Sequence, residues 1–228
     1  MSEQAPVITI DGPGGSGKGT LSRLLARKLG WRYLDSGALY RLLGLAVKRR
    51  GVALDDLPAI LDAANGMAIE FVDDDSGEPV ALLDGEDVSA ELRTEQSGAM
   101  ASHLAAIPEV REALLARQRG FRRPPGLVAD GRDMGTTVFP DADLKLFLTA
   151  SLEERVNRRY KQLKEKGFEI SIDDLFQEIS DRDQRDANRA VSPLRPADDA
   201  VVVDCSSMSI DEMLDCAVEH VREKGLVG

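Results

Sequence analysis

The sequence predicts an α/β fold in which a parallel sheet lies between layers of helices. Several short, continuous apolar runs alternate with segments whose apolar residues recur at helical spacing. A glycine-rich loop joins the first apolar run to the first helical pattern. Continuous apolar strands separated by helices are typical of parallel sheets that are covered on both faces.

The elements follow in a regular order. The expected strands of the sheet are residues 7–10, 31–34, 127–129, 144–148 and 201–203. The expected helices contain the apolar residues of segments 21–29, 39–47, 110–121, 152–163, 172–179 and 213–218. The chain of 228 residues is of a length that suits one domain with a small insertion.

One segment, residues 67–92, departs from this alternation. Ile69 and Phe71 alternate with polar residues, a turn is expected at 73–77, and a second apolar run follows at 80–83. Period-two alternation around a turn predicts a small antiparallel hairpin inserted into the α/β core. The sequence fits two alternatives equally well: a subdomain that closes over a substrate, or a hairpin with no such role.

The glycine-rich loop has the composition of a phosphate-binding P-loop. Its nine residues, which we expect to bind ATP, are Gly12, Pro13, Gly14, Gly15, Ser16, Gly17, Lys18, Gly19 and Thr20. Glycines let successive N–H groups point inward, the following helix adds partial positive charge, and Lys18 reaches the outer phosphates. Ser or Thr usually follows this lysine directly. Here Gly19 intervenes, so Thr20 is the candidate for contact with Mg²⁺ or its water shell.

Composition narrows the class of protein. The net charge of −11 does not steer the chain toward nucleic acid. No apolar run has the length of a membrane span, and no signal-peptide pattern is present, so we expect a cytoplasmic protein. Cys205 and Cys216 are expected to be thiols, and His103 and His220 lack zinc-ligand spacing.

Two polar clusters follow predicted strands, where ligands of parallel sheets bind. In the first, Ser36 and Arg41 fit an anion-binding site at a helix N-terminus. They fit equally well a helix that Ser36 merely caps, with Arg41 on its surface. In the second, Asp130 ends an apolar strand as a Walker B aspartate does. Arg132 and Asp133 follow with no apolar partner, which favours a functional site.

Two further clusters lie on helices. Asp183 and Asp186 continue the apolar stripe of segment 172–179, with Arg182 and Arg189 at its edges. A solvated helix end does not account for so many arginines. Segment 152–163 carries a group made up of Arg155, Arg158 and Arg159, of which Arg155 and Arg159 share a face. These arginines fit either a lid over a transferred phosphoryl group or an ordinary basic helix face.

Together these motifs resemble the bacterial cytidylate kinases, a branch of the nucleoside monophosphate kinases. The segments that carry the resemblance are ITIDGPGGSGKGT, LDSGALYR, VREALLARQR, ADGRDMGTTVFPDA and RDQRDANRA followed by SPL. The resemblance implies a single P-loop kinase domain over 1–228 with strand order 2-3-1-4-5. It also implies an inserted monophosphate-binding region near 62–100, a short helical lid near 150–168, and phosphoryl transfer from ATP to CMP or dCMP with Mg²⁺.

The resemblance also implies roles for individual residues. Ser36 and Arg41 would meet the acceptor phosphate, while Ser102, Arg111 and Asp133 would read the cytosine ring. Asp186 with Arg182 would hold the ribose, and Arg132 and Arg189 would complete the phosphate clamp. Asp130 joins the substrate-binding set. The residues expected to act on the transferred group are Lys18, Arg41, Arg132, Arg182, Arg189, Arg155 and Arg159.

Two other functions keep the P-loop. One is a kinase for another small acceptor such as shikimate or gluconate, which would not need residues that read cytosine. The other is an NTPase switch, although the N/T-K-x-D guanine motif of GTPases is absent from the sequence. We expect a monomer that acts on small molecules, with no nucleic-acid polymer and no membrane among its partners.

Overall fold

The computed structural model describes residues 4–73, 79–165, 167 and 169–226. The chain divides into two compact units. The P-loop unit comprises Met1–Asp35 and Gln118–Gly228, and the second unit comprises Ser36–Arg117. Each unit has its own buried apolar cluster.

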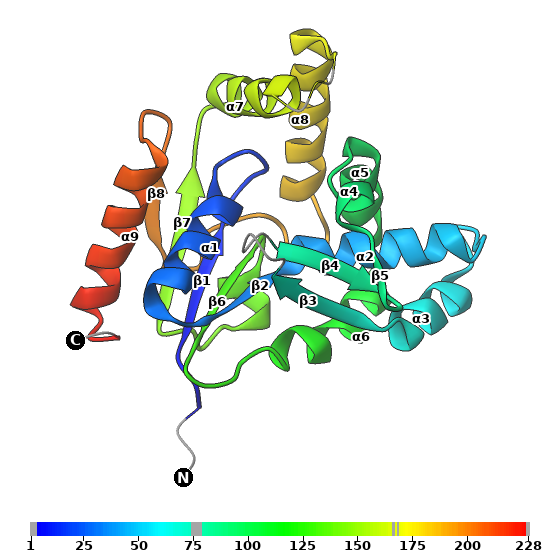
Figure 1. Cartoon of the computed structure of the whole chain (residues 1–228), viewed down its shortest axis with the longest axis horizontal. Helices are drawn as coiled ribbons and strands as arrows, with labels where there is room; N and C mark the ends of the chain where they lie inside the picture. Colours follow the sequence, from blue (N-terminus) through cyan, green and yellow to red (C-terminus); the bar gives the residue numbers. More distant parts are fainter. Residues whose placement is uncertain (1–3, 74–78, 166, 168, 227–228) are drawn as a thin grey trace. The chain divides into compact units, whose positions relative to one another are not determined.

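The P-loop unit is built on a five-stranded sheet with the order β2-β6-β1-β7-β8 (Figure 1). Its neighbouring strands are all paired in parallel. Counted along the chain within this sheet, the order is 2-3-1-4-5, which confirms the predicted topology. The strands are β1 (Val7–Asp11), β2 (Arg32–Asp35), β6 (Leu127–Gly131), β7 (Leu144–Thr149) and β8 (Val201–Asp204).

Strand β1 is the central strand, and burial on both faces explains its continuous apolar sequence. All five of its residues are buried, and Ile8 and Ile10 belong to the main apolar cluster of this unit. Full burial of such a side chain contributes about 1.5–3 kcal/mol. The loop that follows Asp11 therefore starts from a strand that is fully buried and paired on both sides.

Helices cover the sheet and extend beyond its carboxyl edge. The helices of this unit are α1 (Lys18–Leu29), the π-helical turn η1 (Met134–Val138), α7 (Leu152–Glu165), α8 (Ile172–Ala187) and α9 (Ile210–Glu223), together with the end of α6 (Pro108–Arg119). Helices α1 and α9 pack side by side, and α7 packs on α8 (Figure 1). None of the described helices is long and apolar enough to cross a membrane.

The apolar stripe predicted for α8 is only partly buried. Leu175 and Ile179 pack with Val156 and Leu163 of α7. Ile172 and Phe176, by contrast, are 47% and 43% exposed. The stripe thus attaches α8 to α7 through half of its predicted residues.

The second unit contains the predicted hairpin. Strands β3 (Ile69–Asp73) and β4 (Pro79–Leu83) pair antiparallel, and β5 (Glu86–Asp87) adds a third strand. Except for Asp73, the expected turn at 73–77 lies outside the described residues. The end of the segment that we expected to be extended is helical, as α4 (Ser89–Leu92).

Helices share one apolar cluster with this hairpin. They are α2 (Ser36–Arg49), α3 (Leu57–Gly66), α5 (Glu95–Leu104) and most of α6. Helices α3 and α5 were not among the predicted elements. Side-chain caps from Asp56 and Thr94 mark their first turns, and a polar residue before a short helix is a weaker signal than long apolar periodicity.

Gly12 is required where β1 passes into the loop. Its φ is +153°, and a Cβ at this position would lie 2.4 Å from the carbonyl oxygen of Leu148 on β7. We expect Gly12→Ala to lower the free energy of unfolding by about 2–4 kcal/mol, because overpacking adds to backbone strain. Urea denaturation followed by circular dichroism measures this loss.

Gly30→Ala is the matched control for this substitution. Gly30 has a φ of +65°, but nothing lies within 4 Å of a Cβ built there. Its substitution should lower the free energy of unfolding by only about 1 kcal/mol, through backbone conformation alone. Equal losses in the two variants would contradict the close approach to Leu148.

Candidate active site

The loop between β1 and α1 has the conformation of an anion-binding nest. Gly17 stands at the N-cap of α1 with a φ of 91°. Lys18 is the first residue of the helix, and Thr20 lies in its first turn. Left-handed glycines next to a helix N-terminus direct successive N–H groups toward a bound anion. The hydroxyl of Ser16 is buried and has no hydrogen-bond partner among the described residues, which fits a loop that awaits phosphate oxygens.

Cationic side chains converge on this loop from two other segments. A Cβ built at Gly14 would lie 3.5 Å from Arg132 Nη2 and 3.7 Å from Arg182 Nη1. Burial and the neighbouring charge of Arg132 lower the pKa of Lys18 to about 7. A polyanion placed among these cations would favour the protonated form of Lys18. The arrangement therefore suits the phosphates of a nucleotide.

Asp186 of α8 holds two of the predicted arginines. Its side chain is 1% exposed and accepts a hydrogen bond of 2.8 Å from Arg132 Nε. Its other oxygen accepts one from Arg189 Nη2. Burial raises the pKa of Asp186, but the charges of Arg132 and Arg189 outweigh burial and bring it below its usual value. An ionised Asp186 thus joins the ADGRD and RDQRDANR segments into one cluster, a pairing that the sequence did not specify.

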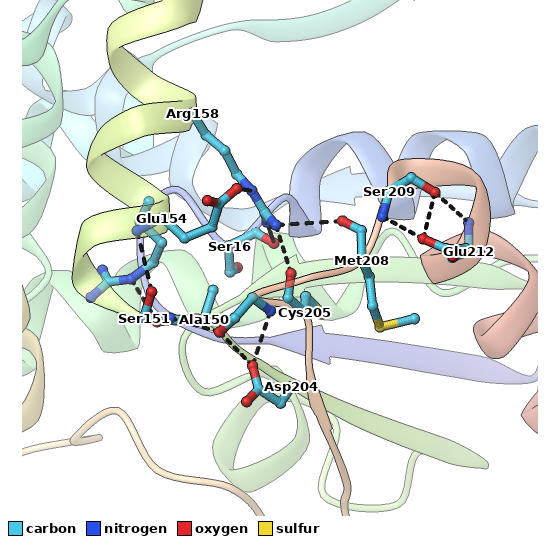
Figure 2. A network of polar contacts seen from close by, with 12 residues as sticks. Ser16, Ala150, Ser151, Glu154, Arg158, Asp204, Cys205, Met208, Ser209 and Glu212 are labelled. Carbon is cyan, nitrogen blue, oxygen red and sulfur yellow. Dashed lines mark hydrogen bonds and ion pairs between the residues drawn. The ribbon is translucent and has the colours of Figure 1, made fainter.

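Two arginines of α7 bind the carbonyl groups of the P-loop. Arg155 Nη1 donates to Gly14 O at 3.1 Å, and Arg155 Nη2 contacts Asp183 at 2.5 Å. Figure 2 shows the second arginine, Arg158, which donates to Ser16 O at 3.2 Å and to Cys205 O at 2.6 Å. These contacts support the outer side of the loop, away from the N–H groups that face an anion.

The sequence did not distinguish Arg158 from its neighbour Arg159. Both lie within one turn of Arg155, at i+3 and i+4, and both spacings bring side chains to one helix face. In the structure, Arg159 donates to Gln162 of the same helix. The contacts of Arg158 with Ser16 O of the P-loop and with Cys205 O after β8 place it at the site, and neither is visible in the sequence.

The Walker B aspartate has an unexpected partner. Tyr33 of β2 donates to Asp130 Oδ2 at 2.6 Å. Burial, with the nearby charge of Asp35, raises the pKa of Asp130 to about 7, and burial with Asp130 raises the pKa of Tyr33 well above its usual value. Strand alternation places Tyr33 and Asp35 on the same face of β2, a signal that could have pointed to Tyr33.

The end of β1 anchors the turn that follows β6. Asp11 accepts hydrogen bonds from the backbone N–H groups of Met134 and Gly135 at 2.9 and 2.8 Å. Burial nevertheless raises the pKa of Asp11 to about 6. Asp133, at the N-cap of η1, is buried. Asp11 thereby fixes the backbone next to Asp133.

The other predicted acceptor residues belong to the second unit. Ser36 begins α2 and is buried, and Arg41 of the same helix donates to Leu92 O at 2.5 Å. Ser102 of α5 and Arg111 of α6 are also buried, and Arg111 Nη1 donates to Ala105 O at 3.3 Å. Buried polar groups need partners, so a set of them beside an apolar core is typical of a specific polar site.

The residues fit Mg²⁺ that arrives on phosphates. No group of three or more His, Cys, Asp or Glu side chains forms a metal cage within the part of the chain that the structure describes. Mg²⁺ usually keeps several waters and binds through one or two carboxylates plus substrate phosphates. Asp130 could serve as such a carboxylate, since its Oδ2 lies 3.5 Å from a Cβ built at Gly19, between Lys18 and Thr20.

Comparisons with known proteins agree with this geometry. A family model described as cytidylate kinase matches residues 8–223. A protein named cytidylate kinase from Shewanella sp. (strain W3-18-1) is 55% identical to this chain, over 98% of this chain and 98% of that protein. A protein of the same name from Aeromonas salmonicida (strain A449) is also 55% identical, over 98% of this chain and 97% of that protein. A solved structure of an uncharacterized protein from Eubacterium ventriosum shares the fold, with a TM-score of 0.53 at 11% identity over 96% of this chain and 99% of that one.

Asp186→Asn tests the electrostatic role of the buried carboxylate. We expect the substitution to lower the free energy of unfolding at pH 7 by about 3 kcal/mol, because it leaves buried guanidinium groups without a countercharge. The folded-state pKa of Asp186 lies below its unfolded value. The stabilisation is therefore present above about pH 4 and lost as the pH falls below it.

Urea denaturation of both proteins between pH 3 and 7 measures this difference. The gap between wild type and Asp186→Asn should narrow as the pH falls below about 4, because the unfolded wild-type chain then takes up a proton at Asp186 that the folded protein binds less readily. Asp183→Asn is the control, since the Asp183 side chain is 26% exposed and its loss should cost less. A gap that is constant with pH would contradict an ionised Asp186.

Proposed function

This chain belongs to the cytidylate kinase family and phosphorylates CMP or dCMP with ATP, and we propose that it does so by positioning and charge neutralisation without a protein base. The nucleophile, a phosphate oxygen of the acceptor, is already ionised near neutral pH. Two polyanions must then be brought together in line. The observation that carries the proposal is the convergence of Lys18, Arg132 and Arg182 at the P-loop.

The P-loop residues Gly12–Thr20 would hold the donor phosphates. Their N–H groups would bind the β- and γ-phosphate oxygens, and Lys18 would supply a mobile cation to the outer ones. Mg²⁺, when bound, neutralises the developing charge on these phosphates. We propose that Thr20 and Asp130 contact Mg²⁺ or its waters.

The acceptor would be held by its phosphate, its ribose and its base. Ser36, Arg41, Arg132 and Arg189 would bind the phosphate, and Asp186 with Arg182 would hold the ribose. An extended buried arginine can clamp a phosphate through two parallel hydrogen bonds, which fixes orientation as well as charge. We further propose that region 62–100 serves monophosphate binding within the single kinase domain.

Ser102, Arg111 and Asp133 would read the cytosine ring. Cytosine presents an amino donor where uracil presents a carbonyl. A carboxylate or hydroxyl accepts from that amine, and an arginine donates to the ring nitrogen and carbonyl. UMP would leave buried groups unpaired, which excludes it more strongly than a difference of shape would.

The lid near 150–168 would contribute arginines to the transferred group. Of these residues, 166 and 168 lie outside those that the structure describes. We propose that Arg155 and Arg159 act on the phosphoryl group when the nucleotide is bound, with closure excluding the water that would hydrolyse ATP. For Arg155 this role would require release of its hydrogen bond to Gly14 O and of its salt bridge with Asp183.

We also propose a monomer that works in the cytoplasm, where ATP and free nucleoside monophosphates are available. Its substrates would be small molecules and not a nucleic-acid polymer or a membrane. The net charge of −11 supports this, because a strongly acidic surface repels both nucleic acid and anionic lipid.

A coupled ADP-release assay with Mg²⁺ and ATP tests the function. CMP, dCMP, UMP, AMP and GMP are offered in turn as acceptors. We expect turnover confined largely to CMP and dCMP. Turnover with a different small acceptor, or ATP hydrolysis indifferent to every acceptor, would contradict the proposed reaction.

Asp133→Ala tests the residues proposed to read cytosine. We expect it to lower the preference for CMP over UMP in kcat/KM by about 10²-fold, which corresponds to the roughly 3 kcal/mol that an unpaired buried polar group can cost. The exposed Asp198 provides the control, and Asp198→Ala should leave the preference unchanged. An unchanged preference in Asp133→Ala would remove Asp133 from the base site.

The pKa of Lys18 predicts how nucleotide affinity depends on pH. Lys18 is largely protonated below its pKa of about 7, so binding there needs no proton. Above pH 7 the neutral amine must take up a proton as the phosphates bind, since a nearby anion raises its pKa. ADP affinity should therefore fall by up to about tenfold per pH unit from pH 7.5 to 9.5.

Isothermal titration calorimetry in buffers of different ionisation enthalpy measures both the affinity and the proton uptake. Lys18→Arg is the matched variant, because a guanidinium stays protonated throughout this range. It should take up less proton on binding and show a flatter pH dependence. Equal proton uptake by both proteins would assign the titration to another group.

A further inference from the structure

The P-loop lacks a hydroxyl at the position that usually carries one. Ser or Thr directly after the lysine normally contacts Mg²⁺ in P-loop proteins, and this chain has Gly19 there. A Cβ built at Gly19 would lie 3.5 Å from Asp130 Oδ2 and 3.9 Å from the Tyr33 hydroxyl. Both distances are ordinary van der Waals contacts. A small side chain would fit at position 19, and its hydroxyl would be within reach of Asp130.

The hydroxyl of Tyr33 already occupies this neighbourhood. It donates to Asp130 Oδ2 at 2.6 Å, in a partly buried setting. Tyr33 and Asp130 lie on adjacent strands, with Asp35 of β2 paired opposite Asp130 and Tyr33 two residues earlier. The tyrosine ring therefore reaches along the strand to bring its hydroxyl to the carboxylate at the sheet edge.

We propose that Tyr33 is a positioning residue that supplies, beside Asp130, a hydroxyl that Gly19 cannot offer there, while Thr20 keeps its proposed contact with Mg²⁺ or its waters. Its hydrogen bond fixes the rotation of the Asp130 carboxylate, which we have assigned to Mg²⁺ or its waters. This inference rests on the proposed function, and it adds a residue that none of the sequence motifs contains. A hydrogen bond of 2.6 Å from a phenol to a carboxyl oxygen is short and directional, as the contact of a group that orients a metal-binding carboxylate must be.

A purely structural role for Tyr33 makes a different prediction. Loss of a partly buried hydrogen bond would then lower stability and leave the response to metal unchanged. A positioning role instead changes the response to metal ions while saturating Mg²⁺ restores turnover. The two roles are thus separated by a metal titration and not by activity alone.

Tyr33→Phe in the full-length protein makes this test. The concentration of Mg²⁺ that half-saturates CMP phosphorylation should rise about tenfold, while kcat at saturating Mg²⁺ changes less than about twofold, as expected for loss of one hydrogen bond to a charged group. Mn²⁺ binding to the protein–ADP complex, followed by electron paramagnetic resonance, should weaken by a similar factor. Binding of ADP without metal should not change.

Rescue at position 19 provides the matched control. In the Tyr33→Phe background, Gly19→Ser returns a hydroxyl to the side of Asp130, and Gly19→Ala adds only the Cβ. We expect Gly19→Ser to recover most of the Mn²⁺ affinity and Gly19→Ala to recover none. Circular dichroism establishes whether each variant is folded. If a double variant does not fold, the result for Tyr33→Phe alone decides between the two roles.

Two outcomes would overturn the inference. One is an unchanged metal dependence in Tyr33→Phe with only a lower unfolding midpoint. The other is equal Mn²⁺ affinity of the serine and alanine double variants. The Mn²⁺–ADP measurement needs no acceptor, so failure of this inference can be told apart from failure of the proposed CMP specificity.

Discussion

Repulsion among the cations gathered at the P-loop is the constraint on which the site depends. Lys18, Arg132 and Arg182 converge at the loop, and burial, together with the neighbouring charge of Arg132, lowers the pKa of Lys18 to about 7. The fold tolerates this cluster because Asp186, almost fully buried, neutralises Arg132 and Arg189 from one side. The remaining positive charge is available for phosphates, whose binding relieves the repulsion.

Support for the loop comes from its outer side. Arg155 and Arg158 bind carbonyl oxygens of Gly14 and Ser16, and Arg158 also binds the carbonyl of Cys205 after β8 (Figure 2). The backbone N–H groups are thereby left to face the anion. A loop held in this way loses little conformational entropy when it binds, which favours affinity through preorganisation. Helix α7 thus supports the P-loop through direct hydrogen bonds, in addition to its proposed role as a lid.

Much of the fold was predictable from the sequence. The five apolar runs and the hairpin around Ile69 and Phe71 were recognised because burial imposes strong periodic patterns. Helices α3 and α5 were missed because they are short and begin with cap residues instead of a long apolar stripe. The π-helical turn η1 depends on hydrogen bonds from Met134 and Gly135 to the distant Asp11, which no local pattern encodes.

The sequence by itself determined the P-loop, the family and the candidate arginines, because glycines, a lysine and charges at fixed spacing carry that chemistry locally. Tertiary structure decided which partner each side chain has. It joined Arg132 to Asp186 across 54 residues of sequence and Tyr33 to Asp130 across 97. It also determined that Arg158, and not Arg159, supports the loop. The two arginines follow Arg155 at equivalent helical spacings, but the folded chain places different partners beside them. Pairing between distant segments follows from sheet order and helix packing, and these are properties of the whole P-loop unit.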